Sequence, residues 1–160
     1  MRRLFKSISG YFIGAAILLV PILLATLFIK GGVYLSRKLL PLLGLLMWII
    51  FAIDFLIMLP LSALKKLKSF TSIVFMISSY VYGLTLWFWG LLLTYIIWGF
   101  IAVFIGLFMA GVGVVPIAIL ATAINGKWVI TIQLLLLSIF TYGSRVYSLY
   151  LAENADKNDY

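Results

Sequence analysis

The sequence predicts an all-α polytopic membrane protein. Of its 160 residues, 66% are hydrophobic and 10% are charged, whereas soluble domains contain about 45–50% apolar and about 25% charged residues. The mean hydropathy is +1.25. Several uncharged stretches are long enough to cross a hydrocarbon core of about 30 Å, which takes about 20 helical residues. A soluble fold would have too little polar surface to cover this much apolar surface.

The first crossing is expected over residues 11–29, with a kink at Pro21. Basic residues precede this stretch, as in a secretory signal, but it is longer than the about 7–15 apolar residues of a signal peptide and no A-x-A cleavage site follows. We therefore expect it to be retained. After a short link, KGGVYLSRK at 30–38, the second crossing covers 39–64, with Pro41 in its first turn.

The next part of the chain, between Lys68 and Lys127, contains no charged residue and allows two interpretations. In a four-helix topology, 66–83 forms an interfacial helix, because polar and apolar side chains fall on opposite faces. The third crossing then covers 84–110 and ends at the turn GVGVVP.

In the same topology, 111–127 is a short re-entrant or bent segment, and the last crossing covers 128–144. The apolar part of the segment, 117–124, is about 12 Å long as a helix, too short to span. Gly and Pro before it and Asn125-Gly126 after it are helix breakers. It is either a re-entrant element lining a cavity or, as we favour, an outer extension of the last helix with a bend at Asn125-Gly126.

A five-crossing alternative places transmembrane helices at 72–96, 98–124 and 128–150. Positive charge distribution favours four crossings with both termini in the cytoplasm. That topology puts eight basic residues on the cytoplasmic side (Arg2, Arg3, Lys6, Lys65, Lys66, Lys68, Arg145 and Lys157) and four outside (Lys30, Arg37, Lys38 and Lys127). Five crossings would divide the same residues seven to five.

Residues 1–152 form a single transmembrane domain in this prediction, followed by a polar C-terminal tail at 153–160. The net charge of +8 is explained by topology and by contact with anionic lipids, without direct binding of nucleic acid. Cysteine is absent and no Asn-x-Ser/Thr sequon occurs. We expect a bacterial inner (cytoplasmic) membrane.

One carboxylate, Asp54, interrupts the apolar run MWIIFAIDFLIMLP. It lies eleven positions before Lys65, about 16 Å deep along a helix. An ionised carboxylate there costs about 2.5–3.5 kcal/mol, so it should face protein or water rather than lipid.

Three roles are open for Asp54. Protonated, it can donate a hydrogen bond to a neighbour such as Thr94, Tyr95 or Gln133. This is the simplest role, because buried polar groups usually have a hydrogen-bond partner nearby. It can pair with Arg145, or copies in an oligomer can form a cation-attracting ring. The candidate pore or buried polar residues are Asp54, Gln133, Thr94 and Asn125.

Small residues recur at helical spacing, which lets helix backbones approach closely in lipid. The predicted helix–helix interface comprises Gly99, Ala102, Gly106, Ala110 and Gly113, together with Gly10 and Gly14. These strips pack helices within one chain or between copies. Because four helices offer few partners to cover two such faces, a homo-oligomer is favoured.

Catalysis is not expected, since the chain has no His or Cys and three of its four acidic residues lie in the tail. No cofactor or metal site is predicted. The first functional hypothesis is a self-associating protein that forms an ion-permeable path or a membrane effector, controlled by a cytoplasmic partner or by the state of the membrane. The alternative is a non-conducting anchor or sensor subunit that recruits a soluble protein to its cytoplasmic basic face, formed by Arg2, Arg3, Lys6, Lys65, Lys66, Lys68 and Arg145.

Overall fold

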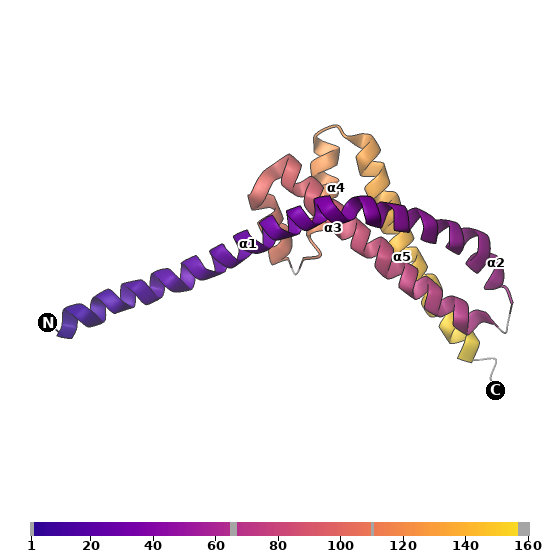
Figure 1. Cartoon of the computed structure of the whole chain (residues 1–160), viewed down its shortest axis with the longest axis horizontal. Helices are drawn as coiled ribbons and strands as arrows, with labels where there is room; N and C mark the ends of the chain where they lie inside the picture. Colours follow the sequence, from indigo (N-terminus) through magenta and orange to yellow (C-terminus); the bar gives the residue numbers. More distant parts are fainter. Residues whose placement is uncertain (1, 65–66, 110, 157–160) are drawn as a thin grey trace.

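A computed structural model describes residues 2–64, 67–109 and 111–156 of the chain, with side chains from residue 17 onward except 18 and 156. The elements are α1 (Arg2–Ile53), the π-helix η1 (Asp54–Met58), α2 (Leu59–Leu61), α3 (Lys68–Phe108), α4 (Val114–Ile124) and α5 (Trp128–Asp156) (Figure 1). Within the described residues, three helical stretches are long and apolar enough to cross a membrane: Leu19–Leu61, Lys68–Phe108 and Trp128–Ala155. The all-helical class is confirmed, and it is compatible with an integral membrane protein.

The first helix, α1, runs without interruption through the segment expected to be a link. The predicted break at 30–38 is therefore wrong, and Pro41 lies inside the helix rather than at its start. Glycine and proline are tolerated in membrane helices, and the three basic side chains of this segment are exposed on the helix surface, so they do not require a loop. The N-terminal half of α1 extends beyond the rest of the molecule (Figure 1).

At its C-terminal end, α1 widens into the π-helical turn η1. The backbone N–H of Leu59 donates to the carbonyl oxygen of Asp54, five residues earlier. Pro60 explains this widening, because a proline has no N–H and its ring clashes with the carbonyl four residues before it. A single π turn ahead of Pro60 makes room for the ring.

The long helix α3 packs antiparallel to α5 along a row of hydroxyl groups. Ser72 and Ser148 each donate to the other's backbone carbonyl at 2.8 Å, and Ser79 donates to the carbonyl of Thr141 at 3.0 Å. The interfacial helix predicted at 66–83 is wrong, since α3 continues through residue 83 without a break. Its polar face meets other helices, whereas the prediction assigned it to water.

Near the C-terminal end of α3, Gly99 ends the straight part of the helix. Its φ of 77° and ψ of −164° lie in a region that favours glycine. Residues 100–108 then reverse direction, and after the turn that contains Met109 and residues 111–113 α4 returns beside them. These two short helices form a helical hairpin, residues 100–124, that begins and ends at the same end of the bundle (Figure 1). The turn at 111–113 also divides residues 98–124, which the five-crossing alternative joined in one helix.

A glycine turn joins α4 to α5. Lys127 N–H donates to the carbonyl of Thr122 at 2.9 Å and Gly126 N–H to that of Ala123 at 3.0 Å, with Gly126 at φ 69°. This is the Schellman arrangement that ends many helices. Because the chain reverses here, α4 packs back against α5, where Thr131 donates to the Thr122 hydroxyl at 2.9 Å. The favoured interpretation of α4 as an extension of the last helix is therefore wrong.

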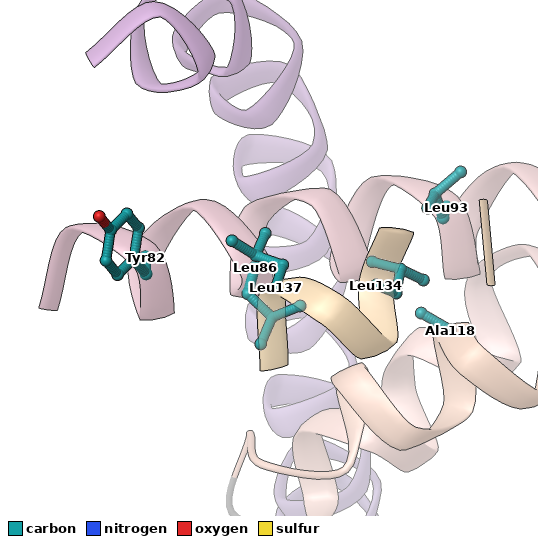
Figure 2. Packing of buried hydrophobic residues seen from close by; sticks show 6 residues of the cluster. All are labelled: Tyr82, Leu86, Leu93, Ala118, Leu134 and Leu137. Carbon is teal, nitrogen blue, oxygen red and sulfur yellow. The ribbon is translucent and has the colours of Figure 1, made fainter. Parts of the chain in front are cut away.

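The apolar core lies where α3, α4 and α5 meet (Figure 2). The buried members of this cluster are Tyr82, Leu86, Leu93, Ala118, Leu134 and Leu137. A second buried cluster joins α1, α3 and α4 through Ile29, Val33, Leu91, Val103 and Val114. In a bilayer, lipid tails are as apolar as leucine, so these clusters hold the helices by close packing rather than by exclusion of water. The first cluster determines how α3 is rotated about its own axis. That rotation also determines the direction of Ser78, one helical turn before Tyr82.

Candidate functional site

Asp54 is the first residue of η1 and only 6% of it is exposed. It faces α3, where Ser78 Oγ donates to Asp54 Oδ1 and the Tyr82 hydroxyl donates to Asp54 Oδ2, both at 2.9 Å. Ser78 and Tyr82 are four residues apart and so lie on one face of α3. Each carboxylate oxygen thus accepts one hydrogen bond from a hydroxyl group. This agrees with the prediction that Asp54 faces protein or water rather than lipid.

The hydroxyl donors differ from the expected ones. Thr94 is fully buried, and its hydroxyl donates to the carbonyl of Val114 at 3.4 Å, while Gln133 is exposed. Counting from the loop between the helices could have identified the true partners. Asp54 lies eleven positions before Lys65, and Ser78 and Tyr82 lie ten and fourteen after Lys68, so two antiparallel helices place them at similar depth.

The remaining predicted polar residues lie away from Asp54. Asn125 is exposed at the end of α4, and its side-chain amide donates to the carbonyl of Ala121 at 2.8 Å. Arg145 lies over the ring of Tyr80, with its guanidinium carbon 5.7 Å from the ring centroid. This is a cation–π contact, in place of the ion pair with Asp54 that was considered.

A cavity of about 430 Å³ opens beside the carboxylate. It lies between the C-terminal end of α1 with η1 and α2 on one side and α3 and α5 on the other. Its lining comprises Phe51, Asp54, Phe55, Leu59, Phe75, Tyr82, Phe140, Gly143, Ser144 and Tyr147. The Tyr147 hydroxyl is also 2.7 Å from Ser62 Oγ, a contact that links α5 to the residue after α2. We call this space the Asp54 cavity.

Two of the predicted interface glycines, Gly106 and Gly113, form close contacts within the chain. A Cβ atom on Gly106 would lie 3.1 Å from the Cα and N atoms of Val114, and one on Gly113 would lie 2.9 Å from Met109 Cβ. Both glycines therefore allow the hairpin of residues 100–124 to close. Gly99 forms the break in α3, and Ala102 is half-buried.

Several predicted residues have no described side-chain environment. Ala110, Lys65 and Lys66 lie outside the described residues. The residues within α1 whose side chains are not described are Arg2, Arg3, Lys6, Gly10 and Gly14. Of the predicted basic face, Lys68 is half-exposed at the start of α3 and Arg145 is exposed on α5.

The fold and the site together define a helical, membrane-compatible protein with one carboxylate buried between apolar helices. Comparison of the chain with protein-family models, with curated proteins and with solved structures found no match.

Proposed function

We propose that the chain is a self-associating integral membrane protein that forms a path for cations, with Asp54 as the residue that attracts them. The observation that carries this proposal is a carboxylate at 6% exposure within an apolar helical stretch, beside a cavity. Placing a charge there is costly, and intramembrane carboxylates characteristically mark ion or substrate pathways. The π turn at Asp54 supports the same assignment, since single π turns occur frequently at functional sites.

Self-association supplies what one chain lacks for such a path. The buried side-chain polar atoms of the described residues all have hydrogen-bond partners, so within one chain they are already used in bonds within and between the helices. Large apolar side chains between Ile17 and Phe28 are exposed on α1, with Ile17 at 67% and Leu27 at 62%. Lipid and further copies of the chain are the surfaces that suit them.

We place the protein in a bacterial inner membrane with both termini in the cytoplasm, on the distribution of its basic residues. Control of the path is assigned to a soluble cytoplasmic partner or to the membrane itself. Anionic lipids suit the basic residues near the ends of the helices.

Replacing Asp54 with Asn tests the path. Asn keeps the shape of the side chain and removes its charge, so we expect assembly to persist and cation flux to fall about tenfold or more, which corresponds to about 1.4 kcal/mol of lost attraction. Potassium flux into liposomes containing purified protein is the measurement. Ser72→Ala is the control, because Ser72 is a buried hydroxyl between α3 and α5 without contact to Asp54. Equal flux in wild type and Asp54→Asn would contradict the proposal.

A non-conducting anchor is the second candidate. It is favoured by the N-terminal half of α1, which extends beyond the bundle as a surface for another protein (Figure 1). Planar-bilayer recording separates the two functions. An anchor gives no cation current under any condition, including after addition of soluble bacterial proteins that bind the purified chain.

A further inference from the structure

The Asp54 cavity is lined mainly by aromatic rings. Six of its lining residues are aromatic: Phe51, Phe55, Phe75, Tyr82, Phe140 and Tyr147. Among the described residues that line it, Asp54 alone carries a charge. The combination of one carboxylate with several aromatic rings favours an organic cation as the ligand, because the faces of aromatic rings are electron-rich and attract cations. Aromatic rings without a carboxylate would accept any apolar molecule.

The rings are held in place by packing. Phe51 and Phe140 meet edge to face at 5.1 Å and 76°, and Phe75 and Tyr147 meet in the same way at 5.1 Å and 89°. Each pair joins α5 to a different neighbour, α1 or α3. The walls of the cavity therefore have a defined shape before any ligand arrives, which reduces the cost of binding.

The size and the oxygen content of the cavity identify the class of cation. A volume of about 430 Å³ lies within the about 300–1,000 Å³ of sites for small organic molecules. Hard metal cations such as Ca²⁺ take six or more oxygen ligands. Among the described lining residues, Asp54 supplies the only carboxylate, and Tyr82, Ser144 and Tyr147 add one hydroxyl group each. Tyr82 already donates to Asp54, and Tyr147 is already in contact with Ser62, so the side chains offer fewer than six oxygen ligands. The carboxylate keeps lone pairs for a ligand, since it has about four acceptor positions and two are used.

The cavity is reached from the apolar surface of the molecule. Phe55 and Phe140 line it and are also 62% and 41% exposed. Gly143 widens this route, because a Cβ atom built on it would meet nothing within 4 Å. A ligand that enters here passes apolar side chains, so it must carry apolar groups beside its charge.

We propose that the Asp54 cavity binds an organic cation with a substituted ammonium group and an apolar or aromatic substituent, with Asp54 as its counter-charge and the aromatic rings as its cage. The inference rests on the proposed role of Asp54 as a cation-binding residue, but it does not require conduction. Gly143 sets the size limit of the ligand.

Binding of benzyltrimethylammonium to the full chain in lipid nanodiscs tests the inference. Equilibrium dialysis of the labelled compound, corrected with empty nanodiscs, should show saturable binding by the wild type. Asp54→Asn should weaken it about tenfold or more, because the counter-charge is lost in a low-dielectric site. Gly143→Leu should abolish it, because the new side chain fills the cavity while Asp54 stays. Neopentylbenzene, the neutral isostere, should not compete with the label.

Gly44→Leu is the matched control. Gly44 is also a helical glycine whose added Cβ would meet nothing within 4 Å, and it lies outside the cavity, so this variant should bind as the wild type does. Wild-type binding that is absent, or that persists unchanged in Gly143→Leu, overturns the inference even if Asp54→Asn fails to fold. Saturable, Gly143-dependent binding without potassium flux supports the inference and contradicts only the cation path.

Discussion

The carboxylate of Asp54 is held by hydroxyl groups that both come from one face of α3. Ser78 and Tyr82 orient its two oxygens, and the side chain is nearly fully covered. An oxygen left without a donor at such a position loses the hydrogen bond that the hydroxyl group supplied. The hydrogen bonds to Asp54 therefore contribute to the contact between α1 and α3.

Tyr82→Phe should destabilise the fold for this reason. The substitution removes the hydroxyl that donates to Asp54 Oδ2 and leaves the ring in place, so we expect a loss of about 1–2 kcal/mol. Thermal unfolding in detergent, followed by circular dichroism, measures it. Tyr34→Phe is the control, since Tyr34 is 68% exposed on α1. Equal unfolding temperatures for the two variants would show that the hydroxyl of Tyr82 contributes nothing.

Among the elements, the hairpin of residues 100–124 shows that glycine allows two helices of this chain to approach closely. Gly106 brings α3 to within contact of the backbone of Val114, and Trp87 Nε1 donates to the carbonyl of Gly111 at 3.0 Å, which ties the tip of the hairpin to the straight part of α3. The hairpin is thus fixed at its tip as well as along its length.

Gly106→Leu should open this hairpin. A Cβ atom there already lies 3.1 Å from backbone atoms of Val114, and backbone cannot move aside as a flexible side chain can, so a loss of about 1–3 kcal/mol is expected. Thermal unfolding should detect it at every protein concentration, because the contact is within one chain. Gly44→Leu, at a site where an added Cβ meets nothing within 4 Å, should leave stability close to that of the wild type. A loss confined to high concentration would assign the Gly106 contact to an oligomer.

Some helix boundaries could be predicted from the sequence and others could not. The breakers Asn125-Gly126 correctly predicted a bend, and α5 begins at Trp128 as expected. The break at Gly99 was not foreseen for the topology we favoured, because glycine is common inside membrane helices and one that breaks a helix looks like one that does not. The partners of Asp54 were missed because they depend on how α3 rotates about its axis, and that rotation is fixed by packing with α4 and α5.

At the scale of the whole molecule, the length of α1 sets the problem of topology. A helix of 52 residues is about 78 Å long, far more than the about 30 Å of a hydrocarbon core. If both of its apolar stretches lie in the bilayer, as we propose, the helix must bend near Gly31 and Gly32 when it enters the membrane. If it crosses only once, the N-terminus lies on the side opposite the C-terminus.

Labelling of single cysteines distinguishes these arrangements. The natural sequence contains no cysteine, so Ser7→Cys, Lys127→Cys and Ala155→Cys each provide one site for an impermeant thiol reagent. We expect positions 7 and 155 to be labelled from the cytoplasmic side and position 127 from the outside, because this arrangement gives the larger difference in basic residues. Labelling of positions 7 and 127 from the same side would replace the four-crossing topology with a single crossing by α1.

The hairpin of residues 100–124 leaves and rejoins the bundle at the same end (Figure 1), and this has a consequence for how the chain is made. Once α1 has determined the side on which α3 begins, α3 and α5 determine the side on which α5 ends, whatever depth the hairpin has reached. The hairpin can therefore insert into the membrane after the other helices, because its insertion does not require any of them to change orientation. An error in the orientation of α3, by contrast, would also reverse the orientation of α5, which follows it in the chain.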